Sequence, residues 1–309
     1  MGQRLVEGPL PSGGSQTAFF GEIPRAVALR DNPDHWLAWM GSGESRKMGK
    51  LRPSLAETCQ GFDRIAIWVD PDPNSYLILF QLVDALKSRT DLLDRMHLAF
   101  PSRRVGELSA AGLRKMRPPP QRLTPEQIQL GCLAWRAHHS HTPEAWFGLL
   151  SNDLDQLPSM RAMVLRILDE LPSARNGLGA SERQLLAQFK NAPNNHGAVI
   201  GGYIGIQPRA TLDYWEIGRR IVSLSRCEPP IILGVGESSF SVELHDDQAR
   251  FAAYCARRWT LSPIGRRIVE GREDLCAHVS VDRWVGNTHL TSDRLWRWDG
   301  TSEALVAPK

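Results

Sequence analysis

The 309-residue chain lacks the cysteine pattern of a disulfide framework or of a thiolate zinc site. Its five cysteines are far apart, and none belongs to a Cys-x-x-Cys pair. No apolar run approaches the ~20 residues that a membrane helix needs, and the first residues lack the basic-then-apolar pattern of a signal peptide. We therefore expect a cytoplasmic protein without a membrane partner.

Known catalytic signatures are also missing. The sequence has no Gly-x-Ser-x-Gly elbow, protein-kinase motif set or Cys/His dyad pattern. The segment "GAVIGGYIG" (197–205) has neither dinucleotide-loop nor phosphate-loop order, so we interpret it as a flexible turn. His138, His139 and His141 lack the i, i+4 spacing of helical zinc ligands and predict a solvated loop. The sequence indicates no cofactor and no confident metal site, and it leaves open whether the chain is an enzyme.

The composition is that of an ordinary globular protein, with 42% hydrophobic and 23% charged residues. A formal net charge of +3 is too small to indicate a polyanionic partner by itself. Nucleic-acid binding would therefore require arginine and lysine side chains to be concentrated on one surface.

Residues 1–116 predict an α/β domain with a small parallel sheet. The β-rich segments "FDRIAIWV" (62–69) and "DRMHLAF" (94–100) flank the helical pattern "SYLILFQLVDALKS" (75–88), for which Ser75 is the expected N-cap. Strand, helix and strand in this order favour a right-handed parallel crossover.

Residues 117–172 predict a linker followed by helices. Three consecutive prolines in "MRPPPQRL" (116–123) exclude a helix or a central strand there. The first helix after them should begin at Thr124, with Gln127 closing a capping box.

Residues 173–290 predict a winged-helix-like α+β domain, followed by a C-terminal strand and tail at 291–309. Its first helix would be "SERQLLAQF" (181–189), capped by Ser181 with Gln184, and a second helix would be "DYWEIGRRIVSLSRC" (213–227). In "RWTLSPIGRRIVEG" (258–271), a strand ending at Thr260-Leu261 would run into a final helix, as the last strand of a wing does.

Three C-terminal segments resemble a bacterial family known only as domain of unknown function 1835: "LPSARNGLGASERQLL" (171–186), "WTLSPIGRRIVEG" (259–271) and "VDRWVGNTHL…LWRWDG" (281–300). "LVEGPLP" (5–11) and "IWVDPDPNSYLILFQLVDAL" (67–86) resemble the N-terminal part of that family. The resemblance spans roughly Leu5 to Gly300 and implies an architecture, not a reaction. Family members usually carry a Gly-Asp strand upstream of the "EGP" loop, which we expect this chain to lack, and a Glu-His-Asp motif where this chain has Asp70, Pro71 and Asp72.

Asp70 and Asp72 follow a predicted strand, where ligands of open α/β sheets bind. They are candidates for holding a metal ion or a ligand, and Glu7 could line the same cleft. The alternative is a rigid Asp-Pro turn in which Asp72 supports the helix start, with Glu7 in a disordered terminus.

Two arginine clusters are candidates for nucleic-acid contact: Arg219, Arg220 and Arg226 in the first, and Arg257, Arg258, Arg266 and Arg267 in the second. Residues 173–290 contain 14 Arg and Lys against 12 Asp and Glu. The alternative is therefore that these arginines pair with Glu216, Glu270, Glu273 and Asp274.

Near the C-terminus, Trp284, Trp296 and Trp298 are expected to hold a strand pair onto the domain. Asp282, Arg283 and His289 lie in the same segment. We interpret Asp282 as the partner of Arg283 or of another arginine in an ion pair, and the alternative is an interdomain polar site.

Our first hypothesis is therefore a cytoplasmic bacterial nucleic-acid-binding or regulatory factor that uses a winged-helix-like domain. The first alternative is an enzyme that acts on a nucleotide or phosphorylated small molecule in the α/β cleft, with Asp70 and Asp72 as its acid or metal-binding pair. The second is a protein-interaction adaptor. Fold alone does not choose among them.

Overall fold

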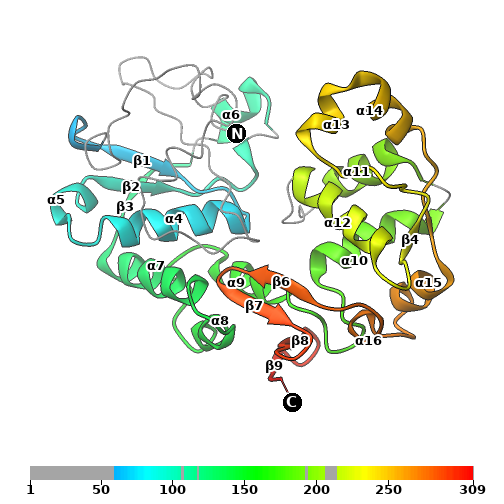
Figure 1. Cartoon of the computed structure of the whole chain (residues 1–309). Coiled ribbons are helices and arrows are strands. Elements are labelled where there is room, and N and C mark those ends of the chain that lie inside the picture. The colour runs from blue at the N-terminus through cyan, green and yellow to red at the C-terminus, as the bar shows by residue number, and fades with distance from the viewer. Residues whose placement is uncertain (1–58, 106–107, 117, 192–193, 206–213, 309) are drawn as a thin grey trace. The chain divides into compact units, whose positions relative to one another are not determined.

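The structure, a computed structural model, describes residues 59–105, 108–116, 118–191, 194–205 and 214–308. It is a mixed α/β protein with small sheets, as the sequence predicts (Figure 1). The chain divides into two compact units: residues 1–165 with 286–288, and residues 166–285 with 289–309. Glu7 lies outside the described residues. None of the described helices has the length and apolar character to cross a membrane.

The first unit contains a three-stranded sheet in the order β1-β2-β3. Its strands are β1 (Ile65–Trp68), β2 (Met96–Ala99) and β3 (Gln121–Arg122). β1 and β2 are parallel and connected through α4 (Pro73–Ala85) and the short α5 (Thr90–Leu93), so the predicted strand–helix–strand unit is confirmed. β3 is antiparallel to β2 and lies inside the segment predicted as a linker. A two-residue edge strand tolerates nearby prolines because few of its backbone donors are needed.

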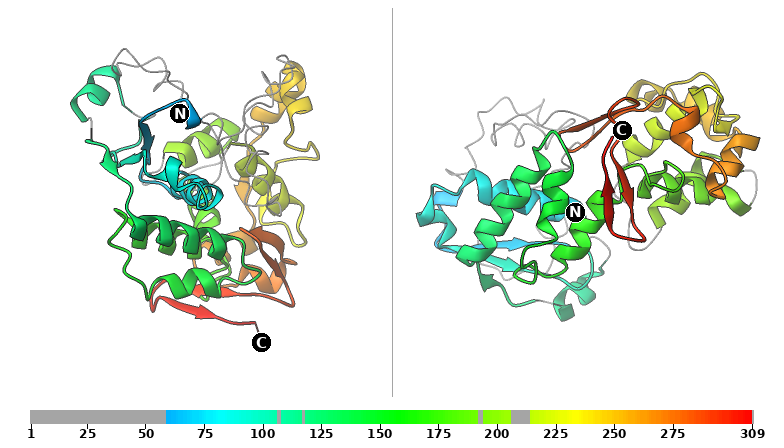
Figure 2. Two further views of the ribbon diagram at one scale, coloured as in Figure 1. Left: turned by 90° about the vertical axis from the view of Figure 1, so that its left-hand side faces the viewer. Right: turned by 90° about the horizontal axis from the view of Figure 1, so that it is seen from below.

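Four further described helices follow β2 in this part of the chain. They are α6 (Ala110–Met116), α7 (Pro125–His138), α8 (Glu144–Leu149) and α9 (Met160–Leu168), the last of which runs into the second unit. α4 and α7 lie side by side (Figures 1 and 2). They approach closely at Gly131, where an added Cβ would lie 2.5 Å from a methyl group of Val83.

Two helix starts in the first unit were predicted, and one is confirmed. α7 begins with the expected capping box, in which Gln127 N donates to Thr124 Oγ1 (3.2 Å) and Thr124 N donates to Gln127 Oε1 (3.1 Å). The prediction of Ser75 as a cap is wrong, because Asp72 caps α4 and Pro73 occupies the first turn, where its missing N–H costs nothing.

The second unit is mainly helical. Its helices are α10 (Ala180–Ala187), the 3-10 turn η3 (Gln188–Asn191), α11 (His196–Gly205), α12 (Tyr214–Arg226), α13 (Val242–Asp246), α14 (Gln248–Cys255), α15 (Pro263–Val269) and α16 (Leu275–His278). Its strands are β4 (Ile232–Leu233), β5 (Thr260–Leu261), β6 (Asp282–Val285), β7 (Thr288–Thr291, which begins in the first unit), β8 (Arg297–Asp299) and β9 (Ala304–Val306). β8 and β9 form the antiparallel hairpin coloured red in Figure 2.

A small β-ladder and a buried core organise this unit. β4 and β5 are antiparallel, and Asn194 forms an antiparallel bridge with Trp259, the residue before β5. Trp259 is fully buried in the core, which also contains Ile217 and Ile221 of α12 and Ile268 of α15.

Two local predictions in this unit are wrong. The segment predicted as a Gly-rich turn is α11, because Val199, Ile200 and Tyr203 lie on one helical face and are buried in the core. α10 begins after Gly179, not at Ser181, because the Glu182 carboxylate accepts the Gly179 N–H (2.9 Å). Tertiary burial and a carboxylate cap decide these two positions.

Candidate functional site

Six of the seven candidate arginines are exposed. Arg219 and Arg226 lie on α12, Arg257 and Arg258 lie between α14 and β5, and Arg266 and Arg267 lie on α15. Arg220 differs from them because its side chain is directed to the interior of the second unit, where its Nη1 lies 3.4 Å from Glu182 Oε1. Burial lowers the pKa of Arg220, and Glu182 opposes that shift. Arg220 is therefore held in a buried ion pair and does not contribute to the exposed set.

Most of the other arginines of this unit form ion pairs. The pairs are Arg183 with Asp169, Arg267 with Glu273, Arg272 with Glu270, Arg283 with Glu182 and Arg297 with Asp274. Arg267 thus follows the alternative in which the arginines serve as partners of nearby acids. Among the described residues, no carboxylate lies within ion-pair distance of Arg219, Arg226, Arg257, Arg258 or Arg266. Within the described ranges, the positive charge of these five exposed guanidinium groups is therefore not offset by an ion pair.

α12 presents a regular polar stripe. Arg219, Ser223 and Arg226 are exposed at spacings of four and three residues, which places them on one face of a helix. Ile217 and Ile221 face the core. The apolar packing of α12 therefore fixes the direction in which the two unpaired arginines point.

A glycine turn after β4 brings the two arginine clusters together. Gly234 and Gly236 have φ values of +88° and +84°, which residues with a side chain rarely adopt. Arg226 Nη2 donates to the carbonyl oxygen of Glu237. A Cβ at Gly236 would lie 1.7 Å from Arg257 Nη1, so the Arg257 guanidinium lies directly against this turn. Arg226 and Arg257, 31 positions apart in the sequence, therefore meet at one turn.

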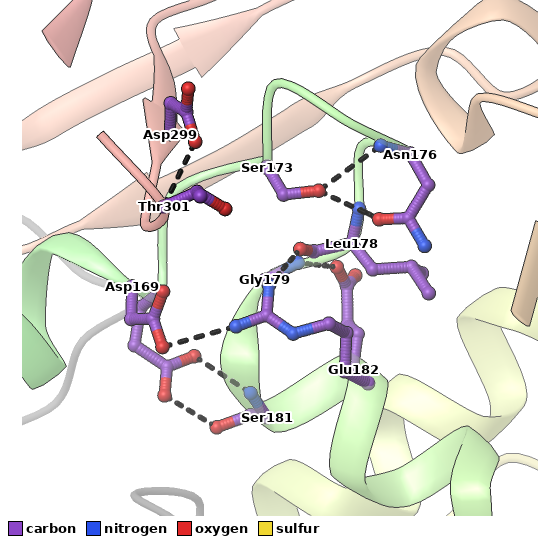
Figure 3. A network of polar contacts seen from close by, with 11 residues as sticks. Asp169, Ser173, Asn176, Leu178, Gly179, Ser181, Glu182, Asp299 and Thr301 are labelled. Atoms are coloured by element: carbon purple, nitrogen blue, oxygen red, sulfur yellow. Dashed lines mark hydrogen bonds and ion pairs between the residues drawn. The ribbon is translucent and has the colours of Figure 1, made fainter. Parts of the chain in front are cut away.

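A polar network lies at the start of α10, where the Glu182 carboxylate accepts the Gly179 N–H (Figure 3). Glu182 Oε1 accepts from Arg283 Nη1 at 2.7 Å and lies near Arg220, while the side chain is only 4% exposed. Burial alone would raise the pKa of Glu182, but the two guanidinium groups more than offset this and hold the pKa below its ordinary value. Ser181 Oγ donates to Glu170 Oε1 at 2.7 Å in the same network. Glu182 therefore links α10, α12 and β6.

The sequence did not single out Glu182. A glutamate in the first turn of a helix is a recognised capping signal, but the sequence offers a competing start at Ser181 with Gln184. Its two arginine partners are 38 and 101 positions away, so no local spacing identifies them.

A second polar cluster, also not predicted, holds the start of α12. Tyr214 Oη lies 2.6 Å from His245 Nε2 and 3.3 Å from His196 Nε2. His245 Nδ1 lies 2.9 Å from the Ser241 carbonyl oxygen, which can only accept, so this nitrogen carries the proton of the neutral ring. Tyr214 then donates to His245 and accepts from His196. Burial, aided by His245, lowers the pKa of His196, which keeps that ring neutral.

Asp282, Arg283 and His289 do not form one cluster. His289 Nε2 lies 2.7 Å from Asp282 Oδ1, and the His289 ring stacks on Trp284 at a centroid distance of 4.4 Å. The expected Asp282–Arg283 pair is wrong: successive side chains of a strand point to opposite faces, and Arg283 faces Glu182.

Asp70 and Asp72 of the first unit are both buried and make contacts with their own chain. Asp72 Oδ1 accepts from Asn74 N (3.0 Å) and Ser75 N (3.2 Å), and Asp72 Oδ2 lies 3.5 Å from Arg104 Nε. Asp70 Oδ1 accepts from Val105 N at 3.1 Å. These contacts match the alternative in which the acids support the turn.

The histidine segment also belongs to the first unit. His138 is the last residue of α7 and is buried, so the expectation of a solvated loop is wrong at this position. The ring of His138 lies 6.0 Å from that of Trp146, and packing of α7 on α8 accounts for the burial. Within the part of the chain that the structure describes, no group of three or more His, Cys, Asp or Glu side chains could hold a metal ion.

Comparison of the chain with models of protein families found no match, and a search of curated proteins found none either. The resemblance to domain of unknown function 1835 therefore stays a prediction.

Proposed function

We propose that the chain is a nucleic-acid-binding factor that uses residues 173–290 as a winged-helix-like domain. The observation that carries the proposal is the set of unpaired, exposed arginines on and beside α12: Arg219, Arg226, Arg257 and Arg258. Exposed guanidinium groups with no acidic partner among the described residues are suited to bind backbone phosphates as fixed positive charges. In this proposal Arg220 belongs to the core and is not a contact residue.

The order of the elements supports the proposal. A winged-helix domain has the element order helix 1, strand 1, helix 2, helix 3, strand 2, wing, strand 3. In its sheet, strand 3 lies in the middle and pairs with strand 1 on one side and with strand 2 on the other. Here the order is α10, the bridge residue Asn194, α11, α12, β4, a long connection and β5. Asn194 pairs with Trp259, and β5 pairs with β4, which is the corresponding strand order. α12 then takes the place of the recognition helix, which other helix-turn-helix domains insert into the major groove.

The connection between β4 and β5 departs from a simple wing because it contains α13 and α14. Its two ends nevertheless lie together. A Cβ at Gly234 would lie 2.1 Å from the Arg258 carbonyl oxygen, and Arg257 lies against Gly236. The base of the connection thus places Arg257 and Arg258 next to the C-terminal end of β4, close to Arg226.

The proposal predicts salt-dependent binding whose slope reports the number of phosphates contacted. Each phosphate contact contributes about −0.9 to the slope of log K against log salt for duplex DNA. The test is fluorescence anisotropy of a labelled mixed-sequence duplex titrated with the full chain between ~50 and ~200 mM salt. We expect Arg219→Gln/Arg226→Gln to weaken binding and to reduce the slope by about 2.

The matched control is Arg250→Gln/Arg272→Gln, which removes the same charge from two exposed arginines that already have acidic partners. It should leave both affinity and slope nearly unchanged. An Arg266→Gln/Arg267→Gln variant tests whether α15 belongs to the interface. Absence of binding at ~50 mM salt, or equal losses in the α12 variant and the control, would overturn the proposal.

A further inference from the structure

The second unit contains a pocket of about 540 Å³ between the last turn of α12 and the glycine turn after β4. Ser225 and Arg226 form its polar side, and Pro230, Ile232 and Leu233 form its apolar side. Residues 234–237 complete the wall. The volume is within the range of about 300–1,000 Å³ that small-molecule sites occupy.

One guanidinium group lines this wall, and a second lies beside it. Arg226 lines the pocket, and its Nη2 is anchored to the Glu237 carbonyl oxygen, which leaves the rest of the guanidinium donors available. Arg257 does not line the pocket itself, but its guanidinium lies against Gly236, which does. Neither arginine forms an ion pair with any described residue. Two guanidinium groups held at one turn form a binding arrangement for a phosphate, which accepts several hydrogen bonds at once.

The backbone of the turn adds further donors. In the described ranges, the N–H groups of Val235, Gly236 and Glu237 donate no hydrogen bond to another protein group. Gly234 and Gly236 bring this backbone against the Arg258 carbonyl oxygen and the Arg257 guanidinium, respectively. Backbone N–H groups without a protein acceptor, next to a guanidinium group, resemble the donors of anion-binding backbone nests.

The apolar side indicates what the rest of the ligand is. A free phosphate ion is far smaller than the pocket and would leave the surface of Pro230 and Leu233 uncovered. Leu233 is 40% exposed, which is high for a leucine beside a core strand. A flat organic group attached to the phosphate would cover this surface.

We infer that the pocket binds an organic phosphate of the size of a mononucleotide. Its phosphate lies between Arg226 and Arg257, and its organic part lies over Pro230 and Leu233. The ligand is either a free nucleotide or a nucleotide at the end of a nucleic-acid strand, since both present the same chemistry. The inference shares two arginines with the proposed interface but does not rest on duplex binding.

Isothermal titration calorimetry of the full chain with AMP, and separately with inorganic phosphate at matched ionic strength, tests the inference. We expect AMP to bind more tightly than phosphate, and Arg226→Gln/Arg257→Gln to weaken AMP binding about tenfold or more. Arg250→Gln/Arg272→Gln should bind AMP as the parent chain does. Glu237→Gln, which removes a carboxylate from the wall, should bind AMP more tightly and serves if the double variant fails to fold.

Competition distinguishes the two sources of the ligand. If AMP displaces a labelled duplex, or a 5′-phosphorylated strand binds better than its 5′-hydroxyl form, the pocket takes a nucleotide of a strand. If AMP binds without affecting either, the ligand is a free nucleotide, and both outcomes support the inference. No AMP binding at millimolar concentration, or equal binding by the double variant, overturns it. AMP binding without duplex binding would refute only the proposed function, and salt-dependent duplex binding without AMP binding would refute only this inference.

Discussion

Replacing Glu182 with glutamine removes the carboxylate that forms ion pairs with two guanidinium groups in the second unit. Arg283 Nη1 lies 2.7 Å and Arg220 Nη1 lies 3.4 Å from Glu182 Oε1. Glutamine keeps an oxygen that can accept the Gly179 N–H, so the cap of α10 is preserved and the charge is what changes. The variant therefore isolates the electrostatic contribution of this residue.

The expected loss is large because the Glu182 side chain is only 4% exposed. Removing one partner of a buried ion pair costs roughly 3–5 kcal/mol, since the remaining charge is left in a poorly solvated environment. We expect Glu182→Gln to lower the free energy of unfolding of the second unit by about this amount. Urea titration monitored by tryptophan fluorescence at pH 7 measures it, with a separate transition fitted for each unit.

The pH dependence supplies an independent check. Because the folded pKa of Glu182 is below its ordinary value, its contribution is complete above the unfolded pKa of about 4.3 and is lost as the pH falls towards the folded pKa. The difference between parent and variant should therefore shrink on acidification below about pH 4.3. Glu270→Gln, at an exposed pair with Arg272, is the control and should cost less than about 1 kcal/mol. A Glu182→Gln loss as small as that of the control would refute the reasoning.

Three further variants test the packing and the pH dependence of the second unit. Gly218→Ala in α12 would place a Cβ 1.9 Å from Phe240 Cδ1 and should lower the free energy of unfolding by about 1–3 kcal/mol. Gly201→Ala in α11 meets no atom within 4 Å and should raise the free energy of unfolding by up to about 1 kcal/mol. Equal melting temperatures for the two variants would contradict the packing described for α12. Burial lowers the pKa of His196 in the folded chain, so the parent protein loses stability as the pH falls below the unfolded pKa of about 6.5. His196→Gln removes this titration, and the free energy of unfolding of the variant should therefore change less with pH over this range. Thermal unfolding between pH 7.5 and 5 measures this, and identical profiles would show that the Tyr214 cluster does not couple to pH.

Local sequence patterns predict several elements of this protein correctly. The strand–helix–strand unit at β1, α4 and β2 follows from two short β-rich runs around one amphipathic segment. The Thr124–Gln127 capping box also follows from neighbouring residues. Such features depend on contacts within a few residues, so local propensity and capping suffice to predict them.

Other elements depend on distant residues. α11 carries four interior or terminal glycines, which locally favour a turn, but burial of Val199, Ile200 and Tyr203 in the core makes it a helix. β3 forms inside a Pro-rich segment because β2 offers it an unpaired edge. Both elements are stabilised by contacts with residues far away in the sequence, so the pattern of neighbouring residues does not predict them.

The candidate site divides in the same way. The positions of the arginines and the amphipathic pattern of α12 follow from the residue order alone. The pairing of Arg220 and Arg283 with Glu182, and the meeting of Arg226 and Arg257 at the Gly234–Gly236 turn, follow only from the folded chain. So does the lack of an acidic partner for Arg219 among the described residues. The charge available to a ligand is what remains after internal pairing, and pairing is set by distances between residues that the chain order leaves far apart.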